Sequence, residues 1–244
     1  MKIIKLNAID STNSFLKELA TSTILENLTI VTTENQVNGR GQLNANWHSE
    51  PFKNLTFSIF INNLNLKIGE KKYLNFAISL AIFEVLYYLK IPNLKIKWPN
   101  DIMSDNKKIC GLLIENTFKG EKIKNSIIGI GLNVNQIEFP NSLQNVSSLK
   151  LITSINFDKE IILNKIIKKI EEYCSLLKQE NFNSLENSYL KHLYKKEITS
   201  MFKTDKKKLF MGIIKGISSN GNLLVELEDS SIKEFGVKEI SFIC

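Results

Sequence analysis

The sequence of 244 residues is poor in cysteine, has one arginine, contains no long apolar run and has no linker rich in proline, glycine or serine. Its three cysteines, Cys110, Cys174 and Cys244, are scattered, so they indicate neither a disulfide framework nor a metal site. No apolar stretch approaches the roughly 20 residues that a membrane-spanning helix needs. The N-terminus also lacks the basic-then-apolar pattern of a secretion signal. We therefore expect a cytoplasmic protein that does not bind membranes.

Hydrophobic residues make up 43% of the chain and charged residues 23%, which is ordinary for a globular protein. The length suits one large domain, or one domain with a small appendage. The net charge is +7, and it could attract acidic partners such as nucleotide phosphates or an acidic protein. The lysines are diffuse, however, and Arg40 stands alone, which favours a solvated basic surface.

The hydrophobic pattern predicts an α+β domain followed by a small β-barrel-like domain. Strands are expected at residues 1–6, 28–33, 54–61, 94–97, 108–116 and 124–133. Helices are expected after a cap at Ser11 or Thr12, and at residues 69–89, 157–177 and 182–193. Short strands at 209–217, 223–228, 232–235 and 239–243, with a hairpin at Asn220-Gly221, follow. We place the domains at 1–195 and 196–244.

Four segments combine polar residues or glycines with strand ends. They are 10–13 (Asp-Ser-Thr-Asn), 36–42 (Gln-Val-Asn-Gly-Arg-Gly-Gln), 97–101 (Lys-Trp-Pro-Asn-Asp) with 107–111 beyond it, and 129–135 (Gly-Ile-Gly-Leu-Asn-Val-Asn). Glycine N–H groups and Arg40 could bind an anion. Asp101 could hold Mg²⁺, and Lys108 could neutralise a carboxylate–phosphate transition state.

Each segment alone also has a structural interpretation. Residues 11–13 can cap a helix, the loop at 36–42 can be a flexible turn, residues 97–101 can be a turn with solvated charges, and the later glycines can serve close packing. The loop matches neither a Walker loop nor a dinucleotide fingerprint.

In this order, however, the segments resemble the catalytic domain of the biotin–protein ligase family. The resemblance implies a class II synthetase-like fold, in which a mixed β-sheet packs with helices. The counterparts of the family's motifs are Ser11-Thr12-Asn13, residues 39–47, 49–55, 97–101, 108–115 (Lys-x-x-Gly…Glu) and 129–133. The match covers most of residues 8–135, and the C-terminal strands fit the family's SH3-like module.

The resemblance implies that biotin and ATP, with Mg²⁺, form biotinyl-5′-AMP and pyrophosphate. Biotin is then transferred to a lysine of a biotin carboxyl carrier protein. Lys108 and Arg40 are the implied catalytic residues. The implied biotin-binding residues are Ser11, Thr12, Asn13, Gln36, Gly39, Arg40, Gly41, Gln42, Lys108 and Gly111. The implied ATP or adenylate contacts are Arg40, Trp47, Asn100, Asp101, Lys108 and Asn133, and Asp101 is the implied Mg²⁺ ligand.

The loop departs from the family pattern, because Gln42 stands where a second arginine is common and residues 43–45 replace a basic stretch. We therefore expect looser retention of the adenylate.

There is no room for a helix-turn-helix before Asp10, so DNA binding is not expected. A monomer and a homodimer are both open. One alternative is a lipoate–protein ligase, but residues 97–101 and the β domain argue against it. The other is a non-catalytic nucleic-acid-binding regulator on the same fold, but the intact Lys108 and Asp101 argue against it.

Overall fold

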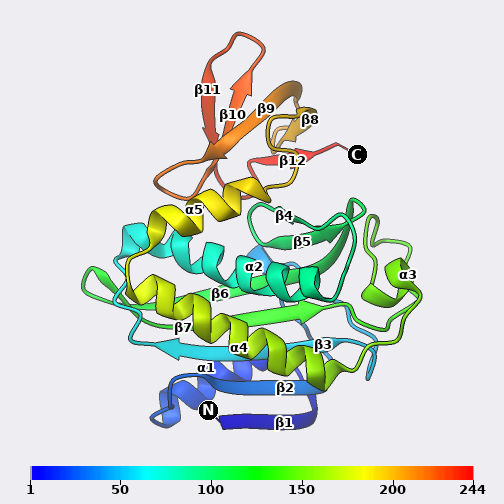
Figure 1. Ribbon diagram of the computed structural model, residues 1–244, viewed down its shortest axis with the longest axis vertical. Coiled ribbons are helices and arrows are strands. Elements are labelled where there is room, and N and C mark those ends of the chain that lie inside the picture. Colours follow the sequence, from blue (N-terminus) through cyan, green and yellow to red (C-terminus); the bar gives the residue numbers. More distant parts are fainter. Residues whose placement is uncertain (1, 244) are drawn as a thin grey trace.

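A computed structural model describes residues 2–243, apart from the side chain of Asn44, and shows two β-sheets with helices packed on the larger one (Figure 1). Met1 and Cys244 lie outside the described residues. The larger sheet contains β1 (Lys2–Ile9), β2 (Thr29–Gln36), β3 (Leu55–Asn62), β4 (Lys95–Lys97), β5 (Asp101–Ser104), β6 (Lys107–Lys119) and β7 (Lys122–Leu132). Their spatial order is β1-β2-β3-β7-β6-β5-β4. Only the β1–β2 ladder among these strands is parallel, so the predicted mixed sheet is confirmed.

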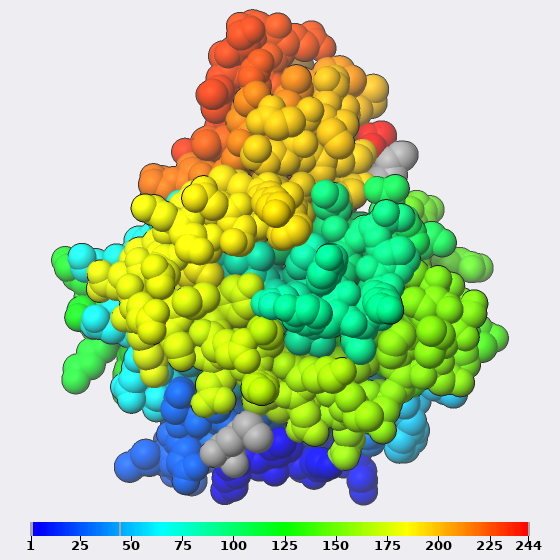
Figure 2. All heavy atoms as spheres, viewed as in Figure 1, coloured from blue at the N-terminus to red at the C-terminus, as the bar shows by residue number. Residues whose placement is uncertain are grey.

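Helices cover both faces of this sheet. They are α1 (Thr12–Ser22), α2 (Lys71–Tyr88), α3 (Leu149–Thr153), α4 (Lys159–Lys178) and α5 (Phe182–Lys191), with short 3₁₀ turns η1 (Gln42–Asn44) and η2 (Ile68–Glu70). Neighbouring residues of a strand point to opposite faces. Ile30 of β2 belongs to the large core with α2 and α4, whereas Val31 packs with Leu16 of α1. Hence α1 lies on the face opposite to α2 and α4, whose side chains cover part of the face seen in Figure 2.

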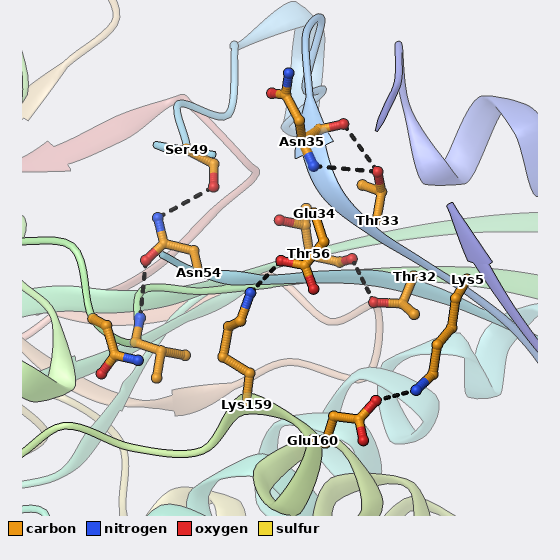
Figure 3. A network of polar contacts seen from close by, with 12 residues as sticks. Lys5, Thr32, Thr33, Glu34, Asn35, Ser49, Asn54, Thr56, Lys159 and Glu160 are labelled. Atoms are coloured by element: carbon orange, nitrogen blue, oxygen red, sulfur yellow. Dashed lines mark hydrogen bonds and ion pairs between the residues drawn. The ribbon is translucent and has the colours of Figure 1, made fainter. Parts of the chain in front are cut away.

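The start of α4 is tied to the edge of the sheet by charged side chains (Figure 3). Lys5 of β1 pairs with Glu160, and Lys159 pairs with Glu34 of β2. Asp158 caps the helix by accepting hydrogen bonds from the backbone N–H groups of its first turn, at 2.8 and 3.1 Å. Because the Lys5–Glu160 pair is exposed, its contribution to stability is small. The buried stripe of α4 supplies most of the stabilisation, since its isoleucines, among them Ile166, lie in the core.

The second sheet stands above the first in Figure 1 as a separate projection. Its strands are β8 (Thr199–Thr204), β9 (Leu209–Ile217), β10 (Leu223–Leu227), β11 (Ile232–Phe235) and β12 (Ile240–Phe242), all antiparallel, in the order β11-β10-β9-β8-β12. The predicted small β domain is therefore present. Its buried Phe202 and Val225 join the core of the larger sheet, and Trp98 Nε1 donates to Gly221 O at 3.0 Å, so the two units are packed together. The boundary at residue 195 stays a prediction.

Some elements differ from those expected. Strand β2 continues to Gln36 and so takes in the start of the predicted loop. The strands β5 and β8 and the five-residue helix α3 were not predicted, because segments this short show too little periodicity. Within residues 2–243, no helix is both long and apolar enough to span a membrane.

Candidate active site

The floor of the site is a patch of bare backbone on β6 and β7. Gly111 and Gly131 face each other across these strands, and Gly129 lies two residues further along the same face. A Cβ on Gly131 would lie 2.3 Å from Trp47 Cε2, and one on Gly129 would lie 2.4 Å from Asn13 Oδ1. The glycines therefore let the indole and the start of α1 approach the sheet directly.

The start of α1 forms a polar wall beside this floor. Ser11 is the N-cap, which confirms the capping interpretation, while Thr12 and Asn13 point into the protein and are 2% and 3% exposed. The backbone N–H and the hydroxyl of Thr12 donate to Gln36 Oε1 at 3.0 and 3.2 Å. Ser58 Oγ lies 2.7 Å from Thr12 Oγ1 and 2.6 Å from Asn13 Oδ1. These groups are fixed in place before any ligand arrives, as recognition of a polar head group requires.

Glu115 links this wall to the loop at residues 39–47. It accepts hydrogen bonds from Asn13 Nδ2 at 2.9 Å and from the Arg40 guanidinium at 3.1 Å. Burial acts to raise the pKa of Glu115, but the hydrogen bonds from Asn13 and Arg40, together with the charges of Arg40 and Lys17, outweigh it and lower the pKa. Glu115 belongs to the motif at residues 108–115, but the sequence alone predicts no role for it, because its partners come from distant segments.

Lys108 reaches the floor because of an irregularity in the sheet. Ile102 pairs with Cys110 but Met103 pairs with Lys108, so β6 carries a bulge at this point. Residues three apart in a regular strand face opposite sides. Here a Cβ on Gly111 would lie 3.2 Å from Lys108 Nζ, so the bulge has turned Lys108 towards the glycine face.

The Lys108 ammonium group lies between a carboxylate and an aromatic ring. Its Nζ is 2.7 Å from Asp101 Oδ1 and 5.5 Å from the centre of the Trp47 ring. Asp101 opens β5 directly after the turn at residues 98–100. That turn is tied to β6, because Leu112 N donates to Asn100 O at 2.9 Å. A cation held by one carboxylate can still interact with an incoming anion.

A cavity of about 340 Å³ opens over the floor. It brings together nearly all of the residues expected to bind substrates: Ser11, Thr12, Asn13, Gln36, Arg40, Gly41, Gln42, Trp47, Asn100, Asp101, Lys108 and Gly111. Two expected residues do not line it, namely Gly39 and Asn133. A Cβ on Gly39 would lie 2.4 Å from Trp47 O, and Asn133 is 2% exposed with its Nδ2 donating to Ser147 O at 3.0 Å. Both residues have packing roles in this structure.

The C-terminal β domain closes one side of the cavity, which the sequence did not predict. Its lining residues are Leu223, Val237, Lys238, Ile240, Ser241 and Phe242. The whole lining carries four positively charged side chains and one carboxylate, that of Asp101. The positive residues are Arg40, Lys97, Lys108 and Lys238. This excess of positive charge suits phosphate and carboxylate groups.

Asp101 is the one acidic side chain available to a metal in the lining. Within residues 2–243 no cluster of three or more His, Cys, Asp or Glu residues could hold a metal ion by itself. Mg²⁺ is commonly bound through one or two carboxylates together with substrate phosphates. The residues therefore fit an Mg²⁺ ion that enters with a nucleotide, and they do not fit a resident metal centre.

Comparison with known proteins identifies relatives over most of the chain. The sequence profile of the Biotin/lipoate A/B protein ligase family matches residues 6–133. The bifunctional ligase/repressor BirA of Bacillus spizizenii is 27% identical over 98% of this chain and 71% of its own length. Biotin–protein ligase 2 of Arabidopsis thaliana is 30% identical over 82% of this chain and 62% of its own length. The solved structure of the Aquifex aeolicus biotin protein ligase in complex with biotin and ATP superposes with a TM-score of 0.80, at 28% identity, over 99% of this chain and 98% of that one.

Proposed function

Because the chain belongs to the Biotin/lipoate A/B protein ligase family, we propose that it is an ATP-dependent enzyme that attaches biotin to a lysine of a carrier protein. The observation that carries the proposal is one cavity over Gly111 and Gly131. A pre-formed polar wall and a set of cations, including Arg40 and Lys108, meet in it. Relatives named as biotin ligases, one of them solved with biotin and ATP, support the same conclusion.

The first step joins biotin to the nucleotide. A biotin carboxylate oxygen attacks the α-phosphorus of ATP, the new C–O–P bond forms the mixed anhydride biotinyl-5′-AMP, and the α–β bridging bond breaks to release pyrophosphate. Negative charge develops on the phosphate, and Lys108 and Arg40 are the residues that stabilise it. Bound Mg²⁺, held by Asp101 and the phosphates, would supply further positive charge.

The second step transfers biotin to the acceptor. The lysine amine attacks the carbonyl carbon of the anhydride, AMP leaves with the bonding electrons, and the nitrogen loses a proton. The acceptor is a biotin carboxyl carrier protein domain. The net charge of +7 would favour its approach if the domain is acidic.

The roles of the other residues follow from their positions. Thr12, Asn13 and Gln36 would bind the polar ureido head of biotin, because they form the rigid wall at the glycine floor. Trp47 and Asn100 would contact the nucleotide. We further propose a cytoplasmic location, supported by the need for ATP and by buried free thiols such as that of Cys110.

The decisive experiment measures pyrophosphate release by the purified chain with ATP and either biotin, lipoate or neither. We expect pyrophosphate release with ATP and biotin, but not with ATP and lipoate or with ATP by itself. Labelling of a biotin carrier domain should follow. Release with lipoate and transfer to a lipoyl domain would make the chain a lipoate ligase. No release with either acid would favour a non-catalytic regulator, and DNA binding with a steep salt dependence would then support that alternative.

A further inference from the structure

The loop over the cavity has few contacts of its own. Its hydrogen bonds include Gly41 N to Ala45 O at 2.6 Å and Trp47 N to Gly39 O at 2.8 Å, both internal to the loop. Leu43, at its tip, has a left-handed backbone with φ 50° and a side chain that is 59% exposed. Neither of these hydrogen bonds joins the tip to another part of the protein.

A contact to the tip comes from the other domain. Lys238 Nζ donates to the backbone carbonyl of Leu43 at 2.9 Å, across 195 positions of the chain. Lys238 also lines the cavity, as do Gly41 and Gln42 of the loop. It is a positive charge at the mouth of the site, on the side where Gln42 has replaced the expected arginine.

The turn that carries Lys238 is held in a defined shape. Gly236 N donates to Glu239 Oε2 at 2.7 Å, and Glu239 N donates to Gly236 O at 3.2 Å. Lys238 itself has φ 67°, a conformation that L-residues other than Asn and Asp rarely adopt. Glycine adopts this conformation without strain, so Lys238 can be replaced by glycine without disturbing the turn.

The turn also faces the loop because the β domain is docked on the catalytic domain. Trp98 Nε1 donates to Gly221 O at 3.0 Å, and Lys97 Nζ lies 5.1 Å from the centre of the Phe242 ring. Both contacts use residues of the motif at 97–101. The same segment that bears Asp101 thus positions the β domain against the loop.

We propose that Lys238 is a positioning residue that holds the loop closed over the cavity by its hydrogen bond to Leu43, and so sets how long the adenylate intermediate is retained. The proposal rests on the proposed function, since it concerns the product of the first step. Lys238 would partly replace the positive charge that the loop itself lacks.

The test compares Lys238→Gly with Lys207→Gly. Lys207 is a matched control, because it is exposed, has φ 64°, lies in the β8–β9 turn and does not line the cavity. Both variants remove one lysine and relieve one left-handed backbone, so neither should lower the melting temperature. We expect Lys238→Gly to release biotinyl-5′-AMP roughly fivefold faster, as loss of one exposed charged hydrogen bond would produce, with Lys207→Gly unchanged.

Two further measurements separate positioning from a general structural effect. Backbone amides of residues 41–46 should exchange hydrogen faster in Lys238→Gly but not in Lys207→Gly, and Lys238→Arg should restore both slow exchange and slow release. Equal adenylate release and equal loop exchange in the two glycine variants would overturn the proposal. If the wild type made no adenylate, the proposed function would fail, while the exchange measurement would still decide whether Lys238 holds the loop.

Discussion

The cavity has a sheet side, which bears Lys108 and Asp101, and a loop side, which bears Arg40 and Trp47. On the sheet side, each residue belongs to a strand that is hydrogen-bonded along its length, and a bulge aims Lys108 at the floor. On the loop side, the contacts include a few internal hydrogen bonds, those of Arg40 with Glu115 and Ser14, the packing of Trp47 on the glycine floor and the hydrogen bond from the β domain.

This difference indicates that the two sides have different functions. Groups that stabilise a developing charge are most effective when they need not move during the reaction, and the sheet side meets that requirement. A cover must open for substrates and products, and segments with few buried contacts open most easily. Changes at Lys108 on the sheet side should therefore affect the chemistry, and changes at the tip of the loop should affect retention. Arg40 lies on the loop side but is paired with Glu115, so a change there should affect both.

The largest expected effect is on the sheet side, at Lys108. Lys108→Ala should lower the rate of biotinyl-5′-AMP formation by about 10²- to 10³-fold, because it removes a fixed positive charge from the reacting phosphate. Single-turnover pyrophosphate release measures this rate. Lys107→Ala, next in the chain and exposed, is the control and should behave as the wild type. Near-wild-type turnover in Lys108→Ala would refute its catalytic role.

The second largest effect is expected where Trp47 of the loop side packs on Gly131 of the sheet side. Gly131→Ala would place a Cβ 2.3 Å from Trp47 Cε2, so the indole must leave the floor. We expect a loss of about 1–3 kcal/mol in the free energy of unfolding, as is typical of overpacking, together with a change in tryptophan fluorescence. Gly69→Ala is the control, since nothing lies within 4 Å of its new Cβ. Unchanged fluorescence and stability would show that Trp47 does not rest on Gly131 in solution.

A smaller effect is expected from adding charge to the loop. Gln42 lines the cavity, so Gln42→Arg should slow the dissociation of biotinyl-5′-AMP by a factor of about three to ten through a charge-assisted hydrogen bond. Val37→Arg places the same charge on an exposed residue that does not line the cavity. If dissociation is the same in the wild type and both variants, loop charge does not control retention.

The smallest effect is the pH dependence of the Glu115 contacts. The pKa of Glu115 is lowered in the folded protein, so its contribution to stability is present above the ordinary glutamate value of about 4.3 and is lost as the pH falls through the folded value. We expect Glu115→Gln to destabilise by under about 1 kcal/mol at pH 6, and by less at a pH below the folded pKa. Unfolding curves at the two pH values measure this. Glu121→Gln, in the exposed β6–β7 turn, should show no such change. If the destabilisation caused by Glu115→Gln were larger at the lower pH, the pKa of Glu115 would not be lowered in the folded protein.

Sequence patterns were sufficient to predict features that depend only on residues close together in the chain. Ser11 caps α1 because its side chain is next to the first turn, and α2 follows from apolar spacing, with Leu74 and Ile78 buried. The motif residues also lie together in the cavity, as their order along the chain suggested. Gly39 and Asn133 do not line it, because a glycine or an asparagine near a strand end serves packing as readily as binding.

The sequence by itself determined the mixed sheet with its helices, the small β domain and the set of residues with suitable chemistry. Periodicity and motif chemistry depend on neighbours along the chain. Only the tertiary structure decided that Gly111 faces Gly131, that a bulge turns Lys108 to their face, that Glu115 joins Asn13 to Arg40 and that Lys238 reaches Leu43. Strand register and domain docking set these contacts, and both depend on how the whole core packs.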